Sequence, residues 1–202
     1  MYSIARFFSH LLSPIFVPTY SVIVALWYTV LFFLPASTRW TVVGVTAIIT
    51  CVIPCAIIFA LYRLGKVSDP GLNNRNERYV PYVVTALCYL ACGFYMWRIH
   101  APLWLDMFFV GGAAAAVVSC IVNIWWKISA HAAAMGGLTA LTIRIMLDHL
   151  NVFDIMPMVY ISILLTGILG TSRIILGRHT FWQVMAGTAN GLACVLLFTM
   201  IH

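Results

Sequence analysis

Two histidines and several basic side chains are the residues of this sequence whose types and positions suit chemistry. His131 closes a polar stretch at 125–131, and His179 lies within a second stretch, 172–187, that also holds two arginines. Imidazoles exchange protons near neutral pH, and guanidinium groups hold phosphate oxygens through paired hydrogen bonds. Together, these residue types predict a site that binds and transfers a phosphoryl group.

Further candidates for such a site lie in the same stretches and in a third one, residues 66–81. The candidate phosphate-binding residues are basic: Arg75, Arg78, Lys127, Arg173 and Arg178. A single histidine or arginine beside a membrane is usually an interfacial residue or an orientation signal. Two histidines that share one membrane face with several cations favour a functional site instead.

The elements that must position these residues are membrane helices. Of the 202 residues, 63% are hydrophobic and only 8% are charged, whereas a soluble domain has roughly 25% charged residues. Apolar runs of near-spanning length occur at 14–35, 41–62, 79–97, 103–126, 131–147, 156–171 and 181–201. Continuous runs favour helices over the alternating pattern of a barrel. We therefore predict an all-α polytopic membrane bundle of six or seven transmembrane helices, forming a single domain over residues 1–202.

The order of these runs predicts where the polar stretches emerge. Residues 66–81 lie between the second and third runs, 125–131 between the fourth and fifth, and 172–187 between the sixth and seventh. Successive stretches are two crossings apart, so all three should reach the same side of the membrane. Helices that begin near His131 and His179 would also direct their positive dipole ends toward that side, where an anion is favoured.

Composition also narrows the classes of ligand and partner. The net charge of +6 is typical of cations that flank membrane spans, so we expect membrane lipids and no nucleic acid as partners. All six cysteines lie in apolar runs without a nearby histidine or carboxylate, which predicts packed thiols and no metal site. Paired aspartate-rich motifs for a magnesium–diphosphate group are absent, which disfavours a prenyltransferase, and no ring of repeated charges suggests a channel.

The segment S-R-I-I-L-G-R-H-T-F-W-Q, residues 172–183, resembles the last motif of the type-2 phosphatidic acid phosphatase superfamily. That motif is Ser-Arg, five residues, His, three residues and Asp. Ser172, Arg173 and His179 match it, and Gln183 stands where the aspartate is expected.

Two further motifs of the superfamily are echoed upstream. Ser129-Ala130-His131 resembles the middle motif, Ser-Gly-His. The first motif, Lys, six residues and Arg-Pro, is loosely echoed by Arg78 followed three residues later by Pro81, with Lys66 or Arg75 in place of the lysine. The resemblance spans residues 66–187, which is most of the chain.

This resemblance implies hydrolysis of a lipid phosphate without a metal or cofactor. His179 would attack phosphorus to form a phosphohistidine, and His131 would protonate the leaving oxygen and then activate water. The arginines and Lys127 would bind the phosphoryl oxygens, and Ser129 and Ser172 would add hydrogen bonds to them. Resemblance to bacterial lipid phosphatases also places the protein in an inner membrane, with its site facing the periplasm.

Gln183 is the main departure from the motif. Positions 179 and 183 share a face of a helix, so the amide oxygen can accept the imidazole N–H and orient the ring, although it carries no negative charge. We therefore expect an active but differently tuned enzyme. Two alternatives remain open: a phosphotransferase with an alcohol acceptor, and an impaired relative that binds or transports lipid phosphates.

Overall fold

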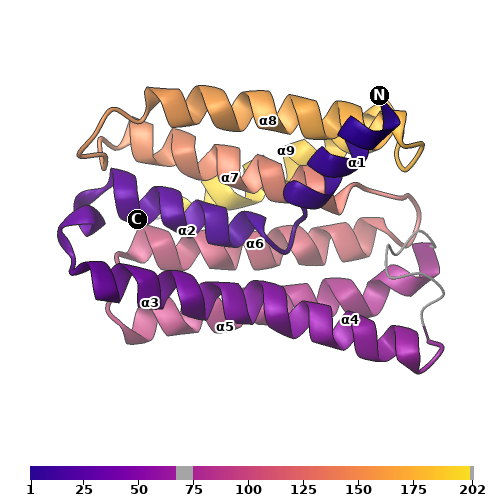
Figure 1. Cartoon of the computed structure of the whole chain (residues 1–202), viewed down its shortest axis with the longest axis horizontal. Helices are drawn as coiled ribbons and strands as arrows, with labels where there is room; N and C mark the ends of the chain where they lie inside the picture. Colours follow the sequence, from indigo (N-terminus) through magenta and orange to yellow (C-terminus); the bar gives the residue numbers. More distant parts are fainter. Residues whose placement is uncertain (67–74, 201–202) are drawn as a thin grey trace.

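Long apolar helices build the molecule. The computed structural model describes residues 1–66 and 75–200, and its helices pack side by side in a bundle (Figure 1). Within the described residues, six helices are long and apolar enough to cross a membrane: Ala36–Arg63, Tyr79–Arg98 (α5), Leu103–Val122 (α6), Ala130–Leu147 (α7), Met156–Ile175 (α8) and Phe181–Thr199 (α9). The predicted all-α polytopic membrane bundle is thus confirmed.

The first apolar run does not form a full span. It contains only the twelve-residue helix α2, Val17–Tyr28, followed by a short 3-10 helix at Val30–Phe33. At 1.5 Å per residue, α2 is about 18 Å long, against a hydrocarbon thickness of about 30 Å. Pro14 precedes this helix, Pro18 lies in its first turn, and the extended backbone of Thr29 ends it, while a preceding helix, α1 (Tyr2–Leu11), packs against α8. The structure therefore has a shorter helix here than the expected span over 14–35.

The longest span carries a local change of helical pitch. Ala36–Ala47 (α3) passes through a π-helical turn at Ile48–Val52 into Ile53–Arg63 (α4). Pro54 lies just after this turn. Because proline has no backbone N–H and its ring crowds the carbonyl four residues earlier, a regular α-helical bond cannot form there. A widened turn accommodates this position without ending the span.

The ends of the helices separate into two groups (Figure 1). The end of α4 and the start of α5, the α6–α7 and α8–α9 connections, and the N-terminus lie at the right-hand end in this view. The α5–α6 and α7–α8 connections and the end of α9 lie at the opposite end. The three polar stretches therefore flank helix ends on one side of the bundle, as their order in the sequence predicts.

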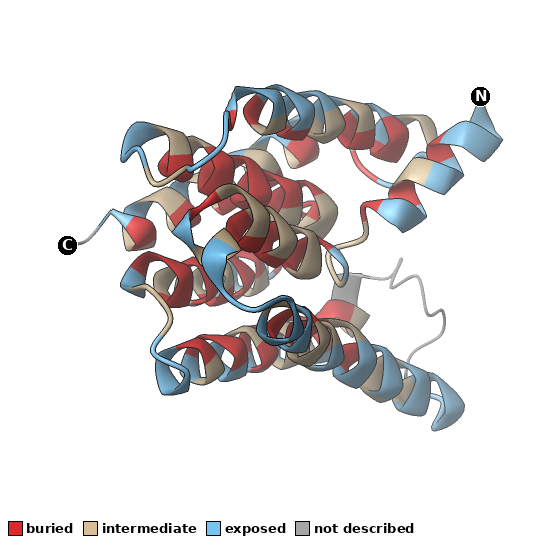
Figure 2. Ribbon diagram, turned by 60° about the vertical axis from the view of Figure 1, so that its left-hand side comes forward, coloured by how far each residue is buried: buried red, intermediate tan, exposed pale blue. Residues whose placement is uncertain are grey.

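Helices α7 and α9 are in close contact because glycines line their interface. A Cβ atom added at Gly136 of α7 would meet the carbonyl oxygen of Thr188, and one added at Gly191 of α9 would meet that of Ala133. Gly187 and Gly191 are four residues apart, which is the spacing of small residues that lets membrane helices approach closely. Figure 2 shows the general pattern, with buried residues on inner faces and exposed ones outside.

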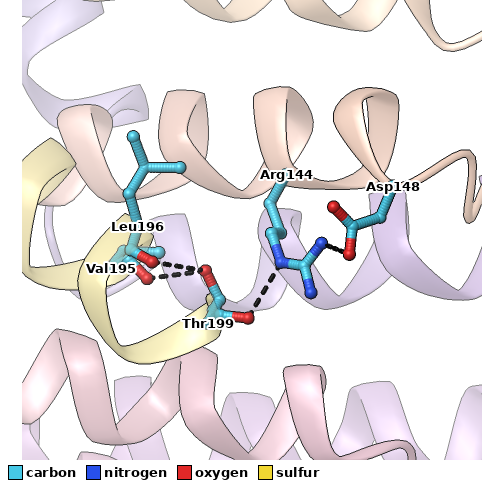
Figure 3. Close-up of polar contacts among 5 residues, drawn as sticks. All are labelled: Arg144, Asp148, Val195, Leu196 and Thr199. Carbon is cyan, nitrogen blue, oxygen red and sulfur yellow. Dashed lines mark hydrogen bonds and ion pairs between the residues drawn. The ribbon is translucent and has the colours of Figure 1, made fainter. Parts of the chain in front are cut away.

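The end of this helix pair farthest from the polar stretches is joined by Arg144. From α7, its Nε donates to the carbonyl oxygen of Thr199 at the end of α9, at 2.8 Å, and its guanidinium forms an ion pair with Asp148 (Figure 3). Arg144 is only 4% exposed. A cation that donates to the last carbonyls of a helix satisfies groups that have no intrahelical partner.

Candidate active site

One cavity brings together the four most informative side chains of the sequence. Its volume is about 170 Å³, and Arg78, His131, Arg173 and His179 lie in its wall. These side chains come from the start of α5, the start of α7, the end of α8 and the α8–α9 connection. Arg78, Arg173 and His179 are each less than 9% exposed. Two imidazoles and two guanidinium groups thus face a shared space at one end of the bundle.

The α8–α9 connection turns sharply and returns His179 to Arg173. Gly177 has φ of +65°, a left-handed conformation that glycine adopts without steric cost. Its N–H donates to Ile174 at 2.9 Å, and that of Arg178 donates to Arg173 at 3.1 Å. These two bonds form a Schellman motif, which satisfies the last carbonyls of α8 and directs the chain back toward the bundle.

Gln183 holds His179 through the start of α9. Thr180 is the N-cap of this helix, and its hydroxyl accepts from the Gln183 N–H at 3.4 Å while the Gln183 Oε1 accepts from the Thr180 N–H at 3.2 Å. The same Oε1 lies 3.2 Å from Nδ1 of His179. His179 thus precedes the helix, contrary to the expectation that positions 179 and 183 lie on one helical face. The contact forms because Gln183 folds back over the helix start, as in a capping box.

This arrangement determines which ring nitrogen of His179 carries the proton. A backbone N–H only donates, so the Gln183 atom that faces Thr180 must be the oxygen. An amide oxygen only accepts, so the Nδ1 of His179 must be the donor to it. The Nε2 of the neutral ring is then unprotonated and has a free lone pair.

His131 is held by the first turn of α7 and by a residue that the sequence analysis missed. Ser129 is the N-cap, accepting from the Ala132 N–H at 3.3 Å, and its own N–H donates to the Gln183 carbonyl at 3.2 Å. The ring of His131 also hydrogen-bonds to the backbone of Ser9 in α1. The two histidine-bearing segments are therefore linked through backbone and capping contacts.

Ser9 contacts the second charged group of the site as well. Its Oγ accepts from Nη1 of Arg173 at 2.7 Å, and Ser9 is buried. One residue of α1 thus holds both Arg173 and His131. Sequence reasoning passed over Ser9 because a lone serine in an apolar segment gives no motif, and only the packing of α1 on α8 brings it to the site.

The site is electropositive and largely shielded from water. Burial, followed by Arg173, Arg78 and Lys127, lowers the pKa of His179 to about 3, which leaves the imidazole neutral. Burial also lowers the pKa of Arg78 and of Lys127, and for Lys127 the surrounding arginines add to the effect. Such mutual repulsion is relieved when an anion binds among the cations.

Arg173 also has hydrogen-bonding capacity left over. Its Nε is buried and has no hydrogen-bond partner within the described residues. A buried donor without a partner costs about 1–3 kcal/mol. Because Arg173 lies in the cavity wall, an oxygen of a bound phosphate is the natural acceptor for this group.

Other predicted phosphate ligands do not lie in the cavity wall that the described residues form. Ser129 caps α7, and the Ser172 hydroxyl donates to the Ile168 carbonyl of its own helix at 2.7 Å. Arg178 is exposed, and Lys127 is half-buried. These residues support the site through its fold or its electric field, and direct contacts of Ser129 and Ser172 with phosphate stay a prediction.

The sequence offered either Lys66 or Arg75 in place of the lysine of the first motif. Lys66 is exposed beyond the end of α4 and does not line the cavity. The side chain of Arg75 falls outside the described part of the chain, and among the described residues Arg78 and Pro81 represent the first motif in the wall.

The rest of the cavity is mainly apolar, although Tyr82, Thr85 and Ser119 also line it. Its wall continues into the bundle between α5, α6, α7 and α9, with α2 and α4 closing the remaining side. The wall is built largely from small and hydrophobic residues, among them Ala115, Ala116, Ala133, Ala134 and Gly191. The same cavity therefore presents cations and imidazoles at one end and a hydrocarbon-like lining along its length.

No family model, curated protein or solved structure matches the chain. Within residues 1–66 and 75–200, no three His, Cys, Asp or Glu side chains are grouped so as to hold one metal ion.

Proposed function

We propose that this chain is a membrane-embedded phosphatase that hydrolyses a lipid phosphate monoester or pyrophosphate through a phosphohistidine intermediate. The observation that carries the proposal is the cavity that combines His131, His179, Arg78 and Arg173 with an apolar interior. The motif resemblance to the type-2 phosphatidic acid phosphatase superfamily supports the same chemistry. An anionic headgroup suits the charged end, and a hydrocarbon tail suits the remainder.

In the first chemical step, Arg78 and Arg173 bind the phosphoryl oxygens and His179 attacks. The lone pair of Nε2 forms a bond to phosphorus while the bond from phosphorus to the leaving oxygen breaks. His131, which takes up a proton from water when the anionic phosphate binds, donates that proton to the leaving oxygen. The two guanidinium groups stabilise the charge on the transferring phosphoryl group.

In the second step, water resolves the phosphohistidine. His131, now neutral, accepts a proton from the attacking water, a new oxygen–phosphorus bond forms, and the bond to Nε2 breaks. Phosphate leaves, and both imidazoles return to their starting states. No metal or cofactor enters this scheme. An alcohol in place of water would give a phosphotransferase.

We also propose that the protein resides in a bacterial inner membrane with this cavity open toward the periplasm. This placement rests on the motif resemblance. The expected partners are the lipid phosphate substrate and the surrounding membrane lipids.

A phosphate-release assay across a panel of lipid phosphates tests the function. Wild type should release phosphate, His179→Ala should release none, and His149→Ala, at the opposite end of the bundle, should behave as wild type. Quenching in alkaline detergent with a labelled substrate should trap a phosphoenzyme that is stable to base and labile to acid, in wild type or His131→Ala but never in His179→Ala. Binding of lipid phosphates without release of phosphate from any of them would instead establish the non-catalytic binder.

Gln183→Glu tests the departure from the motif. Glutamate has the same length as glutamine and keeps an oxygen for the Thr180 N–H and for His179, but it adds a negative charge. The charge stabilises the imidazolium character that develops as Nε2 transfers its group, so turnover should increase. Gln183→Leu removes the acceptor and should lower turnover by about 100-fold or more, as loss of the correct tautomer does in other histidine-based sites.

A further inference from the structure

The apolar arm of the cavity ends at a definite depth. On each surrounding helix, the wall residue farthest from the charged end is Tyr89 of α5, Phe108 of α6, Gly137 of α7 or Val195 of α9. Tyr89 is eleven residues from Arg78, which corresponds to about 16 Å along a helix. Since the hydrocarbon layer is about 30 Å thick, the arm reaches roughly its middle.

Tyr89 is fixed across the deep end of this arm. A Cβ atom added at Gly112 of α6 would lie 2.7 Å from Cδ2 of the Tyr89 ring, so the ring packs in the space that only a glycine leaves open. The Tyr89 hydroxyl donates to the carbonyl of Pro14, between α1 and α2, at 3.4 Å. Its ring also contacts Phe109 edge to face, with centroids 6.4 Å apart. Tyr89 thus joins three parts of the bundle and limits the length of the arm.

The width of the arm favours one chain over two. The whole cavity measures about 170 Å³, and a cavity of about 150 Å³ in another protein is filled by a benzene molecule. A second hydrocarbon chain would therefore have to stay outside, among the bilayer lipids. The small residues of the wall leave a narrow passage between helices that already pack closely.

We propose that this arm is a binding site for a single hydrocarbon chain of the substrate, and that Tyr89 sets the length of chain it accepts. This inference rests on the proposed function for the position of the phosphate, and it goes beyond it by specifying how the tail is held. The substrate is then a single-chain phosphate, or a lipid that inserts only one of its chains.

Alkyl phosphonates test the proposal without turnover, because their carbon–phosphorus bond is not hydrolysed by phosphatase chemistry. The probe is hexyl phosphonate, whose chain has about the volume that the cavity offers, with a photoreactive diazirine at the last carbon, added to the full chain in lipid nanodiscs. Photolabelling followed by peptide mass spectrometry should find the label on Tyr89, Phe108 or Val195. Labelling of Leu87 and Leu90 instead, which lie exposed on α5, would show that the chain stays in lipid and would overturn the proposal.

Competition by unlabelled phosphonates at equal mole fraction tests the role of Tyr89. Dodecyl phosphonate should compete roughly tenfold more weakly than hexyl phosphonate, because a chain longer than the arm must be forced into a packed site. Tyr89→Ala should remove this difference, while Tyr89→Phe, which keeps the ring, and Leu87→Ala, an exposed change on the same helix, should preserve it. A length preference that is unchanged in Tyr89→Ala would contradict the role given to Tyr89.

A diacyl phosphonate tests the single-chain claim, and it should compete no more strongly than its single-chain counterpart. Stronger competition would mean that both chains are held.

The wild-type labelling pattern decides the location of the chain even if Tyr89→Ala does not fold. Deep labelling without phosphate release from any substrate would refute the proposed function alone, whereas phosphate release with lipid-side labelling would refute the chain site alone.

Discussion

At the scale of single residues, the candidate site depends on side chains that fix other side chains. Gln183 faces His179 with an oxygen because the same oxygen must accept from the Thr180 N–H. This contact selects the ring form in which Nε2 is free, through an amide that carries no charge. Three cations around the site and burial keep the imidazole neutral. Gln183 thus supplies the orientation that an aspartate gives in the motif this segment resembles, but not its negative charge.

The depressed pKa of His179 leads to a prediction about pH. Burial and the neighbouring cations lower this pKa to about 3, so the ring should stay neutral between about pH 8 and about pH 5, where a free imidazole with pKa near 6.5 becomes protonated. In the unfolded chain His179 has an ordinary pKa, so the unfolded chain takes up a proton at higher pH than the folded chain. The contribution of His179 to the free energy of unfolding is therefore complete above about pH 6.5 and is lost as the pH falls toward 3. Nitrogen-15 NMR of labelled histidines, assigned with His179→Asn, measures this. A His179 signal that titrates near pH 6.5 would contradict it.

Ser9 is predicted to be a positioning residue. Ser9→Ala removes the Oγ that accepts from Arg173 and keeps the backbone group that bonds His131. Hydrogen bonds to charged groups contribute about 1.5–3 kcal/mol, so the affinity for a competing phosphate analogue such as vanadate should fall roughly tenfold or more. Ser9→Thr should restore it, and Ser3→Ala, on the exposed side of α1, should have no effect. An unchanged vanadate affinity together with a lower melting temperature would indicate a purely structural role.

At the scale of elements, the distance between the two histidines is set by helix packing. Glycines let α7 and α9 approach closely below the site, and the backbone bond from Ser129 to Gln183 ties their first turns together. At the far end, Arg144 donates to the last turn of α9. The pair is therefore held at both ends, which keeps His131 and His179 in one cavity.

Gly191→Ala should disturb this packing directly. The added methyl group would overlap the Ala133 carbonyl, so α7 and α9 must separate. Overpacking of this kind costs roughly 1–3 kcal/mol, and we expect both a lower melting temperature in detergent and loss of phosphate release. Gly167→Ala in α8 is the matched control, because nothing lies within 4 Å of the position its Cβ would take. Normal stability and activity of Gly191→Ala would show that the close approach is not required.

The elements also show what the sequence can predict and what it cannot. Length and hydropathy were enough for the bundle, and the parity of the crossings was enough to place both histidines on one side. The short length of α2 was not predicted because hydropathy does not show where the backbone leaves the helix, as it does at Thr29. Ser9 and the depth of the cavity escaped because they arise from contacts between helices far apart in sequence. The capping roles of Ser129 and Thr180 depend on local geometry that a motif does not describe.

At the scale of the whole molecule, the bundle has two unlike ends. The cavity wall carries its histidines and arginines at one end of the bundle, and the other end holds the Arg144 contacts (Figure 3). Cations outside the site do not distinguish the ends, since Arg6, Arg63 and Lys66 belong to the first and Arg39, Arg98 and Arg144 to the second. The positive-inside rule therefore gives no preference, and orientation depends on the proposed function.

Fusion reporters test this orientation. Helix α9 ends at Thr199, opposite the site, so a site that faces the periplasm places a tag joined after His202 in the cytoplasm. A green fluorescent protein at this position should fluoresce, because it matures in the cytoplasm, and an alkaline phosphatase should be inactive, because its disulfides form only in the periplasm. The opposite pair of results would place the cavity in the cytoplasm. The substrate would then have to come from the inner leaflet, whose phosphate groups are the ones within reach of Arg78 and Arg173.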